Sequence, residues 1–150
     1  MPTSEADVTV SKIDAPDLTE AAQDASLANS ESERRRLAWG RIIDQILEWK
    51  SNPELLAYPE IDPISRDLLN SAIDYASDAR NEPQPPAEPS AVGPASNGGI
   101  AFEWRVGEWL RIIEIVDIGR REVTEIRGGS VVSNYMIERD PRDRGWFKTE

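Results

Sequence analysis

The most regular hydrophobic pattern in the sequence lies between residues 98 and 138, where short runs of β-branched and aromatic residues are separated by glycines. Runs of four to eight such residues, interrupted by turn residues, are typical of β-strands. The glycines predict tight turns at 106–107, 117–119 and 128–129. We therefore expect a four-stranded antiparallel β-meander, with Val131–Ile137 as a more polar strand at its edge.

The first predicted hairpin sets which side chains share a face of this sheet. A two-residue loop at Val106-Gly107 would place Trp104 opposite Trp109. A slip of one residue would turn a whole strand's apolar side chains to the other face, so we expect this register. It gathers these apolar residues on one face: Ile100, Phe102, Trp104, Trp109, Ile113 and Ile115.

In the second hairpin, a three-residue loop at 117–119, with its glycine in the left-handed region, would pair Ile113 with Val123. The same register pairs Arg111 with Glu125. A two-residue loop would instead bring a glutamate onto the apolar face, which is unfavourable. The remaining charged residues of the meander are then expected to line a second, solvated face.

Two segments before the meander carry apolar side chains at helical spacing. The first helix is expected over residues 31–50, where Ser30 begins a capping-box spacing. The second is expected over 63–80, with Asp62 as N-cap and Pro63 as the first helical residue. Both helices need a large apolar partner, and the tryptophan-bearing face of the meander has the right size. We therefore predict an α+β fold in which two amphipathic helices pack on the antiparallel sheet. Their stripes comprise Trp39, Ile42, Ile43, Ile46, Leu47 and Trp49, then Ile64, Leu68, Ala72, Tyr75, Ala76 and Ala79.

Three segments lack such patterns. Residues 1–30 are rich in Ser, Asp, Glu, Ala and Thr, so they cannot bury enough apolar surface to offset the entropy cost of ordering. They are predicted to be a disordered acidic tail. Residues 81–97 contain a run of prolines and are expected to be an extended linker between the helical pair, 31–80, and the meander, 98–138. Residues 139–150 form a charged tail.

The composition excludes most catalytic chemistry. The chain of 150 residues contains no cysteine and no histidine. Disulfides, thiol nucleophiles, thiolate metal sites and histidine-based mechanisms are therefore excluded. No cofactor is expected, because the sequence has no phosphate-binding glycine motif. The N-terminus lacks the features of a signal peptide and no apolar run is long enough to span a membrane, so a cytoplasmic location is expected.

The net charge of −11 is concentrated in the first part of the chain. Residues 1–98 contain eight Lys and Arg against eighteen Asp and Glu, whereas residues 99–150 contain nine against ten. A negative field of this size opposes binding to nucleic acid or to an anionic membrane. Arg34–Arg36 form a basic cluster, but neighbouring glutamates favour a solvated, salt-bridged role for it. The charge suits a protein partner, including a basic one.

The order of these features resembles the order found in a group of small bacterial proteins. In that group a proline-rich segment precedes a GG(I/V)xxEW hairpin, and the proteins have no assigned activity. Here the motif is Gly98-Gly99-Ile100-Ala101-Phe102-Glu103-Trp104, and the similarity covers residues 49–126. The resemblance implies a bacterial origin and helices that precede the meander. It implies no activity and no site residue.

These observations predict a non-catalytic protein-interaction module, such as an accessory or antitoxin-like protein with one protein partner. If the tryptophans pack against the helices, the partner surface is instead the other face or the edge of the sheet. The edge strand also leaves pairing with a second copy open. The candidate partner-binding residues are mostly aromatic, as in many interfaces: Trp104, Trp109, Arg111, Trp146 and Phe147.

Two other functions stay open. Glu114 lies opposite Glu122 in the expected register, and two close carboxylates can bind a hard cation or serve in acid/base chemistry. Glu103 and Glu125 are further candidates for such a site. Nucleic-acid binding through Arg34–Arg36 and the C-terminal tail is a third possibility, which the overall charge opposes.

Overall fold

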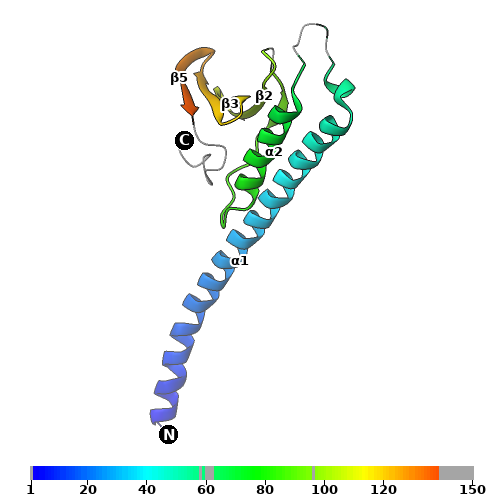
Figure 1. Cartoon of the computed structure of the whole chain (residues 1–150). Helices are drawn as coiled ribbons and strands as arrows, with labels where there is room; N and C mark the ends of the chain where they lie inside the picture. Colours follow the sequence, from blue (N-terminus) through cyan, green and yellow to red (C-terminus); the bar gives the residue numbers. More distant parts are fainter. Residues whose placement is uncertain (1, 58, 60–62, 96, 139–150) are drawn as a thin grey trace. The chain divides into compact units, whose positions relative to one another are not determined.

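The structure is a computed structural model that describes residues 2–57, 59, 63–95 and 97–138, with side chains from residue 22 onward (Figure 1). Trp146 and Phe147, like the whole charged tail, lie outside the described residues. The chain divides into two units, Met1–Arg34 and Arg35–Glu150. All buried core residues belong to the second unit. No helix in the described part of the chain is both long enough and apolar enough to cross a membrane.

Helix α1 spans Pro2–Ser51 and is longer than the sequence predicts. Residues 2–30, expected to be disordered, continue the helix, so Ser30 lies inside it instead of capping it. Every side chain from residue 22 to residue 30 is exposed, as the argument from composition requires. Backbone hydrogen bonds rather than burial therefore hold these residues in the helix. A short 3-10 helix, η1, follows at Pro53–Leu56.

Helix α2 spans Arg66–Arg80 and begins later than predicted. Its N-cap is Ser65, whose hydroxyl accepts a hydrogen bond from the backbone N–H of Leu68 at 3.1 Å. The expectation that Pro63 starts the helix is therefore wrong, and Asp62 lies outside the described residues. Serine caps a helix as well as aspartate does, so the capping preference alone does not favour Asp62 over Ser65.

The sheet has five antiparallel strands in the order β1-β2-β3-β4-β5, one more than predicted. The additional strand, β1 (Ala91–Pro94), comes from the proline-rich segment and pairs with β2. Its position at an edge explains how a strand with a proline is accommodated, since an edge strand needs fewer ladder hydrogen bonds. The predicted strands are β2 (Ile100–Val106), β3 (Trp109–Asp117), β4 (Arg120–Arg127) and β5 (Ser130–Glu138).

The first hairpin keeps the predicted faces but not the predicted pairs. Its loop is Gly107-Glu108, so Trp104 lies opposite Arg111 and Trp109 lies opposite Val106. The loop glycine has a φ of 60°, which suits a two-residue hairpin loop that begins with glycine. The register differs from the prediction by two residues. Because side chains alternate with a period of two, the same apolar residues still share one face.

The second hairpin has the predicted pairs but not the predicted three-residue loop. Asp117 pairs with Arg120, which leaves a two-residue loop, and a register shift between Ile115 and Asp117 restores the predicted pairing further along the strands. Ile113 pairs with Val123 and Arg111 pairs with Glu125. Gly119 has the predicted positive φ, 74°. The third turn falls at the predicted glycine pair, both of whose residues also have positive φ, and β5 forms an edge of the sheet as expected.

The core lies between the helices and one face of the sheet, which we call the helix-side face. Figure 1 shows α2 alongside the part of α1 that belongs to the second unit. Trp39 joins the elements, because its ring centroid lies 6.3 Å from that of Tyr75 and 6.5 Å from that of Phe102. This packing of two helices on one face of an antiparallel sheet confirms the predicted α+β fold. The core comprises Trp39, Ile43, Ile46, Trp49, Leu56, Leu69, Ala72, Tyr75, Ala76, Ala79, Ile100, Phe102, Ile113, Ile115 and Val123.

One charged side chain is fully buried in this core. Arg121 lies on the helix-side face of β4, opposite Ile115. Its guanidinium carbon lies 5.4 Å from the ring centroid of Tyr75, within the range of a cation–π contact. The aromatic ring thus supplies part of the environment that a buried cation requires.

Candidate functional site

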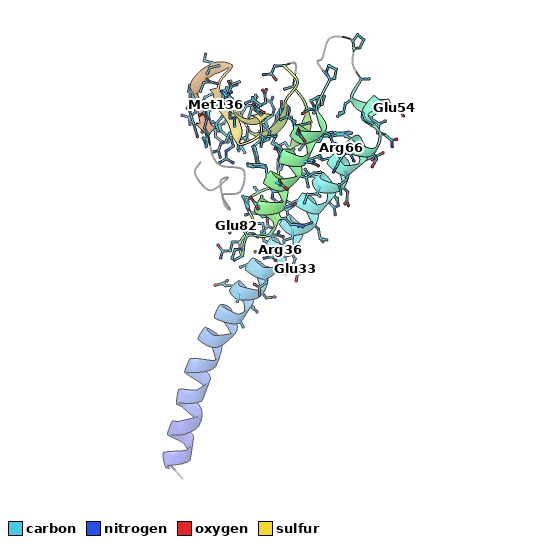
Figure 2. The ribbon with its side chains drawn as sticks, in the orientation of Figure 1. Glu33, Arg36, Glu54, Arg66, Glu82 and Met136 are labelled. Atoms are coloured by element: carbon cyan, nitrogen blue, oxygen red, sulfur yellow. The ribbon has the colours of Figure 1, made fainter. Side chains whose placement is uncertain are left out.

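Arginines of α1 donate hydrogen bonds to the backbone carbonyls of the proline-rich segment. Arg36 bonds the carbonyl of Pro83 at 2.9 Å and that of Glu82 at 3.3 Å (Figure 2). Arg35 bonds the carbonyl of Pro85 at 3.1 Å. These two members of the basic cluster therefore have a structural role within the domain.

Two tryptophans donate to the same segment. The indole N–H of Trp39 bonds the carbonyl of Pro86 at 2.9 Å, and that of Trp104 bonds the carbonyl of Ala87 at 2.8 Å. The two indole rings also contact each other, with centroids 6.4 Å apart. Residues 83–87 are thus part of the packed domain rather than a solvated spacer.

The structure brings the described candidates for partner binding together on the helix-side face. Trp104 lies opposite Arg111, and Trp109 lies two residues before Arg111 on β3. All three side chains are half-buried. Arg111 pairs with Glu125, with Nε 3.8 Å from Oε1. Trp104 also packs on Trp39 and so belongs to the interior packing of the domain, whereas Trp109 and Arg111 are half-exposed and stay candidates for partner binding.

Glu114 and Glu122 lie directly opposite each other on the outer face of the sheet, as predicted. Burial raises the pKa of Glu114 above its ordinary value. A hydrogen bond from the Asn97 side chain lowers this pKa in part, and the negative charge of Glu122 raises it further. Gly99 packs against this carboxylate, because a Cβ at Gly99 would lie 3.1 Å from Oε2 of Glu114. Among the described residues, no three Asp, Glu, Cys or His side chains are grouped to hold a metal ion.

Replacing Glu114 by glutamine is expected to change how stability depends on pH. Because the pKa of Glu114 is raised in the folded chain, the folded state binds this proton more tightly than the unfolded state does. The free energy of unfolding of the wild type therefore falls as the pH rises from the ordinary pKa of a glutamate to the raised one. Glu114→Gln should lose this slope and be more stable than the wild type above that range.

Urea denaturation at a series of pH values measures this difference. Glu122→Gln is the control, since it removes only the neighbouring charge. It should move the raised pKa of Glu114 downward and leave part of the slope in place. Identical pH profiles for the wild type and Glu114→Gln would contradict the assignment.

Strand β5 presents exposed apolar side chains at an edge of the sheet. The exposed fractions are 63% for Val131, 57% for Val132, 38% for Tyr135 and 41% for Met136. Residues 130–137 include no charged residue. Figure 2 shows Met136 on this outermost strand. Natural proteins usually protect such an edge with charges or proline, and because residues 130–137 contain neither, β5 is a candidate docking surface.

Apolar residues of three neighbouring strands, β3, β4 and β5, lie side by side on the outer face of the sheet. Ile126 lies opposite Leu110 on one side and opposite Val131 on the other. The outer face was expected to be solvated, and Glu103 does lie there. Glu125, however, lies on the helix-side face, opposite Arg111. The outer face is therefore partly apolar near β5.

Comparison with known proteins adds no family to this description. No protein-family model, curated protein or solved structure matches the chain. The resemblance to bacterial proteins with a GG(I/V)xxEW hairpin stays a prediction, as do the bacterial and cytoplasmic assignments. Function has to be argued from the surface of the domain itself.

Proposed function

We propose that this chain is a non-catalytic protein-interaction module that binds its partner along β5. The observation that supports this most strongly is the edge itself, a nine-residue strand with exposed apolar side chains and no charge before Glu138. The outward N–H and C=O groups of an edge strand bond an added strand, and the side chains of that edge give specificity. Docking of a strand would also cover the exposed apolar surface.

The chemistry of the chain supports a binding role over catalysis. The sequence contains no histidine and no cysteine, which leaves carboxylate, lysine or tyrosine chemistry. Trp104, one of the candidate anchors for a partner, contributes to the packing of the domain through its contact with Trp39. A partner surface at the edge of the sheet is consistent with both facts.

Affinity purification of the tagged full chain from its own cells tests the proposal. We expect a stoichiometric partner that is lost with Met136→Lys, because a lysine in an edge strand opposes strand addition. Val106→Lys is the matched control, since Val106 is 70% exposed at the end of β2 and away from β5. Circular dichroism establishes that both variants fold. A partner that a folded Met136→Lys variant retains would exclude β5 as the binding site.

A second candidate function is cation binding, favoured by the direct opposition of Glu114 and Glu122. Two carboxylates on directly opposed residues of neighbouring strands offer oxygen ligands to Ca²⁺ or Mg²⁺. A titration with either ion, followed by thermal denaturation, tests it. The expected result is a rise in Tm that disappears in Glu114→Gln. An unchanged Tm at saturating ion concentration would reject this function.

A further inference from the structure

We infer that the strand that docks on β5 is the β5 of a second copy of this chain, paired antiparallel across a two-fold axis. This inference rests on the proposed function and names the partner of the same edge. Two-fold pairing of identical edges closes on itself, so it uses up both exposed strands and produces a dimer with one continuous sheet.

The two edges of the sheet differ in how well they could accept a strand. Strand β1 has four residues, and one of them, Pro94, has no N–H to donate. Strand β5 has nine residues and no proline. Among the described strands, β5 is therefore the edge that offers a long run of backbone donors and acceptors.

The side chains of β5 specify what its partner must look like. Tyr135 lies opposite Val123 and belongs to the helix-side face, whereas Met136 lies opposite Glu122 and belongs to the outer face. Both are exposed, so a partner strand has to offer apolar contacts on both of its faces. Strand β5 itself has this property. In a two-fold antiparallel pair, opposed residues share a face, so each face of the sheet continues into the same face of the copy.

The charges of β5 also fit a copy better than a basic partner. When identical strands pair antiparallel, charges close to the axis meet like charges, which is destabilising. Residues 130–137 have no charge, so this penalty does not arise. Glu138, at the end of the strand, is paired with Arg120 of β4 at 3.1 Å. A basic partner would find no other carboxylate along this strand.

A bulge in β5 limits where the axis can lie. Glu125 pairs with Ser133, but the next residue, Ile126, pairs with Val131, which leaves Val132 as an additional residue in β5. Such a bulge bends the strand and interrupts regular pairing. We therefore place the two-fold axis in the regular part of the strand, between Ser133 and Ile137.

Sedimentation of the purified full chain across the micromolar range tests the inference. The wild type is expected to dimerise. Met136→Lys is expected to raise the dissociation constant of the dimer by about tenfold or more, because the two new lysines, one from each copy, would lie near each other across the axis. Val106→Lys should leave the dissociation constant unchanged. Added salt should strengthen the wild-type dimer, since each chain has a net charge of −11 and salt screens the repulsion.

The absence of cysteine allows a direct map of the contact. Single cysteines are introduced one at a time at residues 133–137 and oxidised, with Val106→Cys as the control. A disulfide needs Cα atoms about 4.4–6.8 Å apart, so cross-linking should peak at the residue nearest the axis and be absent at the control position. Equal cross-linking at all positions would overturn the inference.

The outcomes also separate this inference from the proposed function. A monomeric wild type that still captures another protein through β5 would overturn self-pairing and leave the interaction-module proposal standing. A monomeric wild type that captures nothing would overturn both. A dimer that a folded Met136→Lys variant retains would place the self-contact elsewhere and overturn the inference.

Discussion

A Trp39→Ala variant is expected to lose about 3–5 kcal/mol of its free energy of unfolding, the cost typical of truncating a large buried aromatic residue. Trp39 is fully buried and contacts the rings of Tyr75, Phe102 and Trp104. The substitution also removes the donor to the carbonyl of Pro86. Single domains are typically stable by about 5–15 kcal/mol, so this one change should remove much of the stability.

Urea denaturation followed by far-UV circular dichroism measures this loss without relying on tryptophan fluorescence. Leu37→Ala is the matched control, because Leu37 lies in the same helix and is 65% exposed. Its stability should stay within about 0.5–1 kcal/mol of the wild type. Trp39→Phe keeps an aromatic ring but not the indole N–H, and should fall between the two. A Trp39→Ala variant as stable as Leu37→Ala would contradict the central role of this residue.

Gly99→Ala is expected to cost about 1–3 kcal/mol or more, the usual range for forcing an extra group into a packed site. A Cβ at this position would lie 2.7 Å from the backbone oxygen of Ile115 and 3.1 Å from Glu114. The carboxylate could move aside, but the backbone oxygen is fixed by the pairing of β2 with β3, where Ile115 lies opposite Ile100. The hairpin would have to open locally to admit the methyl group.

Thermal and urea denaturation of a glycine series test this argument. In Gly93→Ala and Gly40→Ala, the new Cβ would meet no atom within 4 Å. Gly93→Ala should therefore change stability by less than about 0.5 kcal/mol. Gly40→Ala, inside helix α1, should stabilise by up to about 1 kcal/mol, because alanine favours a helix more than glycine does. Equal stability of Gly99→Ala and Gly93→Ala would contradict the close approach.

The two glycines of the GG(I/V)xxEW motif thus have different roles. Gly98 has a φ of 89°, a conformation that glycine adopts without strain. Gly99 is required because another backbone passes close to it. A sequence motif shows that two glycines occur together, but only the tertiary structure separates these two reasons.

The residues that the sequence analysis missed are the ones whose environment is set by distant segments. Arg121 lies opposite Ile115, as follows from the pairing of Ile113 with Val123, yet the environment of its guanidinium depends on Tyr75 of α2. Likewise, nothing local indicated that Trp104 would donate to the carbonyl of Ala87. The lack of charged residues at 130–137 can be read from the sequence, whereas the exposure of Met136 is seen only in the structure.

The sequence by itself determined the alternation of apolar and polar side chains, and with it the presence of two helices, the order of the hairpins and the choice of helix-side face. Local rules suffice for these features, because a period of two or of 3.6 residues fixes which side chains share a face. Even a register wrong by two residues, as at Trp104, left the faces unchanged.

Only the tertiary structure decided how the proline-rich segment is used and which edge of the sheet stays open. Residues 83–87 are fixed by donors from α1 and β2, segments far away in the sequence, and this places β1 along β2. Once β1 covers that side, β5 is the long edge that remains. The physical reason is that backbone carbonyls of prolines need donors, and the sequence does not say which side chains will reach them.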